Sequence, residues 1–117
     1  MPTRHYRDEF SKEYPKIRPG FENDLEWLNK GMSLLRKGKL TKAESIFKKL
    51  VLSQPHHPDG LEGLAKTYKM IGNRAKSLMF INDAIEMTSK MVASGESDKE
   101  ILLDMNELRE EIIKMPK

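Results

Sequence analysis

The sequence predicts an all-α fold, a short solenoid of two helix hairpins followed by one C-terminal capping helix. The first observation behind this prediction is a repeat, because residues of matching size recur 34 positions apart without an insertion or deletion. The second is that each copy has a glycine where its first helix would end. One hairpin cannot bury its apolar face alone, so the copies are expected to stack. The seven matched pairs are Trp27 and Leu61, Gly31 and Ala65, Leu34 and Tyr68, Gly38 and Gly72, Ala43 and Ser77, Phe47 and Ile81, and Val51 and Ile85.

Residues 1–22 are predicted to be a flexible N-terminal arm. Residues 1–21 contain five basic and three acidic residues, three prolines and a glycine. Pro15 and the Pro19-Gly20 turn signal interrupt any helical pattern. We therefore expect an extended arm that becomes ordered only if its aromatic side chains dock. These aromatic residues, which we interpret as irregularly spaced, are Tyr6, Phe10, Tyr14 and Phe21.

Five helices are expected in a domain that spans residues 23–115. Three capping boxes, in which Asn, Thr or Ser precedes Glu by three residues, indicate helix starts at Asn23, Thr41 and Ser97. Three glycines indicate helix ends at Gly38, Gly72 and Gly95. The expected helices are about 24–37, 42–53, 58–71, 74–94 and 98–114, which gives repeats at about 24–57 and 58–94 and a capping helix at about 98–114.

The last predicted helix is amphipathic. Its apolar stripe consists of Ile101, Met105, Leu108 and Ile112. Its acidic residues lie off this stripe, and we expect them to form a solvated outer face. They are Asp104, Glu107, Glu110 and Glu111.

The composition limits the chain to one small domain. It has 117 residues, of which 38% are hydrophobic and 33% are charged, so its core is modest. The absence of cysteine excludes a disulfide framework and a thiolate metal site. The N-terminus has no apolar segment of the signal-peptide type, and no run approaches the roughly 20 apolar residues of a membrane span. We therefore expect a soluble, cytoplasmic protein with no membrane partner.

Charge is divided unevenly along the chain. Residues 30–76 contain 11 Lys or Arg against three acidic residues, a net charge of +8. Residues 77–113 contain three against nine, a net charge of −6. Opposed segments of this kind predict either attraction between molecules or two different partners.

The region from Asn23 to Glu86 resembles the tetratricopeptide repeat family. The residues that carry the resemblance are Trp27, Gly31, Ala43, Phe47 and Pro55 in the first unit, and Ala65, Tyr68, Gly72 and Ala84 in the second. Departures from the family pattern are Lys30, Leu50 and Ser77. The resemblance implies units of two antiparallel helices whose first helices line a concave groove.

The first predicted helix has more apolar surface than its packing needs. A stripe through Trp27, Gly31 and Leu34 suffices for packing against its neighbours, which leaves the apolar side chains on the rest of the helix uncovered. The resemblance implies that this second face points into the concave groove. The predicted partner-binding residues of the groove are Leu25, Leu28, Met32, Leu35, Arg36, Lys66, Lys69 and Met70.

We therefore predict a non-enzymatic protein–protein interaction module, an adaptor or chaperone-like protein that binds a peptide or helix in the groove. An apolar wall beside a partly basic wall favours an amphipathic or acidic partner. Three occupants compete for this surface: the chain's own arm, a second copy in a homodimer, and a foreign segment. The arm is disfavoured because its aromatic residues are interpreted as irregularly spaced.

The alternative function is a basic nucleic-acid-associated protein that uses the Lys/Arg-rich face of residues 30–76. It is disfavoured because Phe47 and Tyr68, which would stack on bases, are expected in the core. No nucleophile and base are paired in the sequence, so no catalytic residue is predicted. His56 and His57 are neighbours in a short loop and do not make a metal site. No cofactor is predicted.

Overall fold

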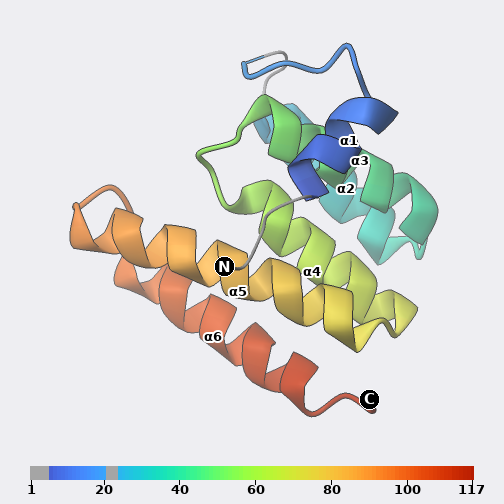
Figure 1. Cartoon of the computed structure of the whole chain (residues 1–117). Coiled ribbons are helices and arrows are strands. Elements are labelled where there is room, and N and C mark those ends of the chain that lie inside the picture. Colours follow the sequence, from blue (N-terminus) through green and yellow to red (C-terminus); the bar gives the residue numbers. More distant parts are fainter. Residues whose placement is uncertain (1–5, 21–23) are drawn as a thin grey trace.

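The computed structural model describes residues 6–20 and 24–117, and within them the chain forms six helices and no strand (Figure 1). The predicted all-α class is confirmed. The expected bounds of five helices agree with the observed bounds of α2 to α6 to within two residues. The helices are α1 (Tyr6–Glu13), α2 (Asp24–Arg36), α3 (Leu40–Ser53), α4 (Asp59–Ile71), α5 (Arg74–Ala93) and α6 (Lys99–Ile113).

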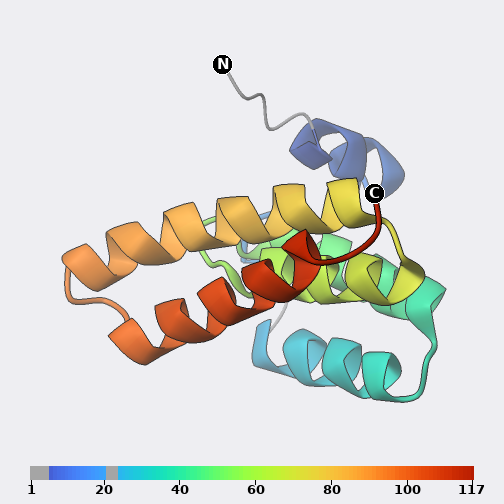
Figure 2. The same ribbon diagram turned by 90° about the horizontal axis from the view of Figure 1, so that it is seen from below.

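The helices from α2 to α6 pack in the order of the chain. Each contacts the next one, and α2 also contacts α4. The additional helix α1 packs on α3. Figure 2 shows α1 and α2 on opposite sides of the molecule, with α3, α4 and α5 between them. The N-terminal helix therefore does not cover α2.

The predicted glycine ends are found at Gly38, Gly72 and Gly95, which all have positive φ. Gly72 has a φ of 92°, in the left-handed region that a residue with a Cβ rarely adopts. This conformation lets the N–H of Asn73 donate a hydrogen bond of 2.9 Å to the carbonyl of Tyr68. The end of α4 is thereby closed, and α5 can begin at Arg74.

Two of the predicted capping boxes are wrong. Thr41 lies inside α3, whose N-cap Lys39 makes no side-chain capping bond, and α6 begins after Asp98 rather than Ser97. The reason at α3 is the turn that precedes it. The N–H of Lys39 bonds the carbonyl of Leu34, and the carbonyl of Lys39 already accepts from Ala43. This turn starts α3 at Leu40, so Thr41 is the second residue of the helix and does not occupy its N-cap. The box at Asn23 lies outside the described residues.

The core is built around the ring of Phe47, which is fully buried between α2 and α4. A Cβ added at Gly31 would lie 2.6 Å from two carbons of this ring, and one at Gly63 would lie closer still. Both distances are far below an ordinary carbon contact. The ring therefore occupies the space that two missing side chains leave, and the three helices approach closely at this point.

Two departures from the repeat pattern are accommodated inside the core. Leu50 is fully buried in α3. Ser77 is also fully buried, and its hydroxyl donates a hydrogen bond of 2.6 Å to the carbonyl of Ala65 on the facing helix α4. The hydroxyl therefore does not remain unsatisfied, which is why serine is tolerated where alanine is expected.

The prediction of a helix-free arm is wrong for residues 6–13, which form α1. Tyr6 and Phe10 are 6% and 4% exposed, and their ring centroids lie 5.1 and 6.3 Å from that of Phe80 on α5. Phe80 in turn stacks on Tyr68 of α4 at 5.7 Å. The spacing of four between Tyr6, Phe10 and Tyr14 was the signal for this helix, because it places aromatic side chains on one helical face. Phe21 lies outside the described residues.

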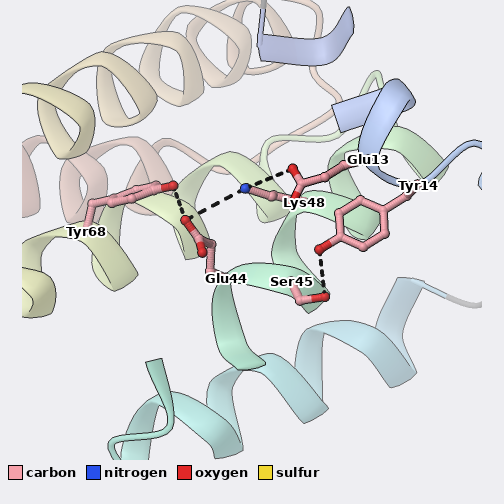
Figure 3. Close-up of polar contacts among 6 residues, drawn as sticks. All are labelled: Glu13, Tyr14, Glu44, Ser45, Lys48 and Tyr68. Carbon is pink, nitrogen blue, oxygen red and sulfur yellow. Dashed lines mark hydrogen bonds and ion pairs between the residues drawn. The ribbon is translucent and has the colours of Figure 1, made fainter. Parts of the chain in front are cut away.

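Polar contacts fix the same segment in place (Figure 3). Lys48 of α3 lies 3.1 Å from the carboxylate of Glu13 and 3.8 Å from that of Glu44. Glu44 accepts a hydrogen bond from the hydroxyl of Tyr68. The Tyr14 hydroxyl donates to Oγ of Ser45 at 2.9 Å, and the Tyr6 hydroxyl donates to Asp83 of α5 at 2.7 Å. Residues 6–14 are therefore tied to α3 and α5 by polar contacts.

We predict that Gly63→Ala destabilises the protein by about 1 to 3 kcal/mol, because the new Cβ overlaps the ring of Phe47. This is opposite to the usual effect of replacing a helical glycine by alanine. Chemical denaturation followed by circular dichroism measures the free energy of unfolding of the variant and of the wild type. Phe47→Leu removes the overlapping ring, so the double variant should lose less stability than the two single losses together. Additive losses would contradict the packing of Phe47 against Gly63.

We predict that Phe10→Ala lowers the free energy of unfolding by about 3 kcal/mol, because it empties the aromatic cluster between α1 and α5. The matched control is Lys12→Ala, which changes an exposed residue of the same helix. The same denaturation experiment compares the two. Equal stability of both variants would mean that α1 does not contribute to the folded core.

Candidate binding groove

A cavity of about 480 Å³ opens where α2, α4 and α6 come together. It is called the groove below. Helix α2 contributes Leu35 to its floor. The wall from α4 consists of Glu62, Lys66, Lys69 and Met70. The wall from α6 consists of Asp104, Glu107, Leu108 and Glu111.

The structure brings together four of the eight predicted partner-binding residues, and these are Leu35, Lys66, Lys69 and Met70. Leu35 is only 5% exposed and lies at the floor, whereas Met70 is 53% exposed at the rim. The other four predicted residues do not line the groove, and these are Leu25, Leu28, Met32 and Arg36.

The expectation that half of α2 is uncovered is corrected by the packing of this helix. Leu25 is 61% exposed, but Leu28 and Met32 are half-buried and pack against the core. The reason is that Leu28 and Met32 themselves pack against core side chains, so the neighbouring helices cover more of α2 than the stripe through Trp27, Gly31 and Leu34. Neither side chain is available as a fully open docking surface.

The described part of the N-terminal arm does not occupy the groove. Helix α1 packs on α3, and its aromatic side chains lie against Phe80 of α5. These contacts are on the side of the molecule that faces away from α2 (Figure 2). Residues 6–20 therefore do not cover the groove.

Both lysines of the groove already have carboxylate partners. Lys69 Nζ lies 3.2 Å from Glu111 Oε1, which joins α4 to α6. Lys66 Nζ lies 3.9 Å from Glu62 Oε2 on the same helix. Among the described residues, no ion pair joins Asp104 or Glu107 to a lysine or arginine. The groove therefore carries more acidic than basic side chains.

The carboxyl of Glu62 has a raised pKa. Burial is the largest cause, because it removes water from the charged form. Lys66 acts in the opposite direction, whereas Asp59 and Asp104 raise the pKa further through their negative charges. Asp104 comes from α6 and Glu62 from α4, so negative charge is concentrated between these two walls.

Sequence reasoning missed the contribution of α6. Its acidic residues were interpreted as a solvated outer face, but three of them line the groove: Asp104, Glu107 and Glu111. Their spacing of three and four residues places them on one face of a helix and was visible in the sequence. The sequence does not show that α4 lies opposite that face.

The basic residues proposed for nucleic-acid binding are partly used within the protein. Lys48 pairs with Glu13 and Glu44, and Lys49 lies over the ring of Tyr14 at 5.3 Å. Lys37 and Lys39 remain exposed in the turn between α2 and α3. The phosphate-binding surface that the alternative needs is therefore smaller than the charge count suggests.

No group of three or more metal-ligating side chains is found in the described part of the chain. No helix there is both long and apolar enough to span a membrane.

No protein-family model matches the chain, and comparison with curated proteins and with solved structures gave no match. The family assignment thus stays a prediction from the repeat pattern.

We predict that Glu62→Gln stabilises the protein at neutral pH. In the wild type the folded state holds the Glu62 proton more tightly than the unfolded state, whose ordinary pKa is 4.5. Stability is therefore lost as pH rises through the raised pKa of the folded state. The advantage of Glu62→Gln should shrink as pH falls from the raised pKa towards 4.5, and below 4.5 it should be lost.

Denaturation curves over a pH series measure this difference. The control is Glu110→Gln, which removes a carboxylate from an exposed position of α6. A Glu62→Gln variant that is less stable than the wild type at neutral pH would show that the pair with Lys66 outweighs the cost of burial.

Proposed function

We propose that the chain is a short tetratricopeptide-like solenoid that acts as a non-enzymatic protein-interaction module, and that it holds a segment of another protein in the groove. The repeat assignment is supported by the packing of α2 to α6 in chain order and by the contact between α2 and α4. In a repeat array each unit contacts its neighbours in the chain, and the extra helix α6 covers the last one.

The observation that carries the proposal is the composition of the groove. Three helices that do not follow one another in sequence meet around one cavity, with an apolar floor at Leu35 and Leu108 and charged side chains at the rim. An apolar base that supplies contact area and a charged rim that sets orientation are what a bound segment needs.

The size of the cavity agrees with this use. A volume of about 480 Å³ accommodates a few side chains rather than a whole folded partner. The rest of the segment would then lie along the rim, where Met70 is exposed. Binding of this kind is carried by a small number of anchor residues.

The nucleic-acid alternative is not favoured by any contact of the structure. Two of its lysines are held by the N-terminal segment, and the basic turn between α2 and α3 has no exposed aromatic side chain for stacking on bases. Adaptor or chaperone-like action remains the better description of a chain with an open groove.

We predict that filling the groove abolishes binding. Peptides selected from a random library on the immobilised protein serve as probes, and fluorescence anisotropy measures their affinity. Glu107→Trp places a large side chain in the groove and should weaken binding by at least about tenfold. Glu110→Trp makes the same change at an exposed position of α6 outside the groove and should leave binding unchanged.

Selected peptides whose affinity is equal for both variants would place the binding surface elsewhere. A library that gives no binder would also contradict the proposal. Circular dichroism of both variants checks that the fold is retained.

A further inference from the structure

We infer that the segment held in the groove is cationic, a lysine- or arginine-bearing stretch with apolar anchors whose positive side chains lie against Asp104 and Glu107. The inference rests on the proposed function and adds the chemical class of the partner. It reverses the sequence-based expectation of an acidic partner, which counted the lysines of α4 but not the acidic wall of α6.

The first reason is the balance of charge in the groove. Its lining has four carboxylates, namely Glu62, Asp104, Glu107 and Glu111, against the two lysines Lys66 and Lys69. Each lysine has a carboxylate within ion-pair distance, at 3.9 Å and 3.2 Å. An acidic segment would therefore have to displace existing pairs, whereas a basic one meets carboxylates that the described residues leave without a cation.

The second reason is that carboxylates on the two walls of the groove repel each other. The carboxyl of Glu62 is partly buried, and the charge of Asp104 opposes its ionisation. A cation that enters between α4 and α6 relieves this repulsion, and the attraction is stronger there than in open water because the surroundings are less polar. An incoming carboxylate would add to the repulsion.

The third reason is the combination of surfaces. Lysine and arginine have long apolar stems below a charged end group. Such side chains can lay their stems over Leu35 and Leu108 on the floor while their charged ends reach the carboxylates at the rim. A short acidic side chain has no comparable stem.

A second copy of the chain fits this surface less well. Exposed lysines and arginines are spread over the described chain, and their tightest cluster in sequence is Arg36, Lys37 and Lys39, at the end of α2 and in the turn that follows. No large apolar side chain is strongly exposed in this turn, so it offers no anchor for the apolar floor. This cluster therefore fits the groove less well than a segment of a different protein that carries both basic and apolar side chains.

The test uses random peptides displayed on phage, selected on the full chain and then sorted by their dependence on the groove. Groove-dependent peptides are those that bind the wild type but not Glu107→Trp. We expect these peptides to be rich in Lys and Arg beside apolar residues. Asp104→Asn should weaken them by about three- to tenfold, whereas the exposed Glu110→Gln should not.

The other outcomes separate this inference from the proposed function. Groove-dependent peptides that are acidic or neutral, or that bind Asp104→Asn unchanged, would overturn the cationic partner and leave the binding function standing. Absence of any groove-dependent peptide would overturn both. Sedimentation that shows oligomers of the wild type but monomers of Glu107→Trp would assign the groove to a second copy and would also overturn the inference.

Discussion

The fold depends on one close approach, the insertion of the Phe47 ring between Gly31 and Gly63. Because neither glycine has a side chain, α2 and α4 both lie directly against the same ring of α3. This contact sets the separation of α2 from α4, and the groove exists because these two helices lie side by side in front of α3. The residue at the centre of the core therefore also influences the shape of the groove.

The molecule has two faces with different roles. On one face, α1 is fixed by an aromatic cluster with Phe80 and by bonds to Asp83, Ser45 and Lys48. A helix of eight residues is too short to be stable alone, so it forms because it docks there. On the other face, α2 contributes the apolar Leu35, and α4 and α6 leave charged side chains around an open cavity. The chain itself covers the first face with α1, whereas residues 6–20 leave the groove on the second face open.

The basic and acidic segments of the sequence are partly paired with each other inside the fold. Lys69 belongs to the basic segment and Glu111 to the acidic one, and they form an ion pair between α4 and α6. Arg74 likewise donates to the backbone carbonyl of Ile113 at the end of α6, at 3.2 Å. The opposed segments therefore help to hold the last helix in place. What remains after this pairing is an excess of carboxylate in the groove, which gives the proposed partner its charge.

The all-α class, the glycine helix ends and the small residues of the core could be predicted from the sequence, because they follow from spacing and backbone conformation within a few turns of helix. It also contained the spacing of Tyr6, Phe10 and Tyr14, although their regularity was overlooked. The helix faces that meet could not be predicted, because they depend on how whole helices pack together. Lys66 and Lys69 were assigned to a basic wall from their own helix, but the character of that wall depends on Asp104 and Glu107, which are distant in sequence. A helix face acquires its electrostatic environment from the element packed opposite it, and periodicity along one segment carries no information about that element.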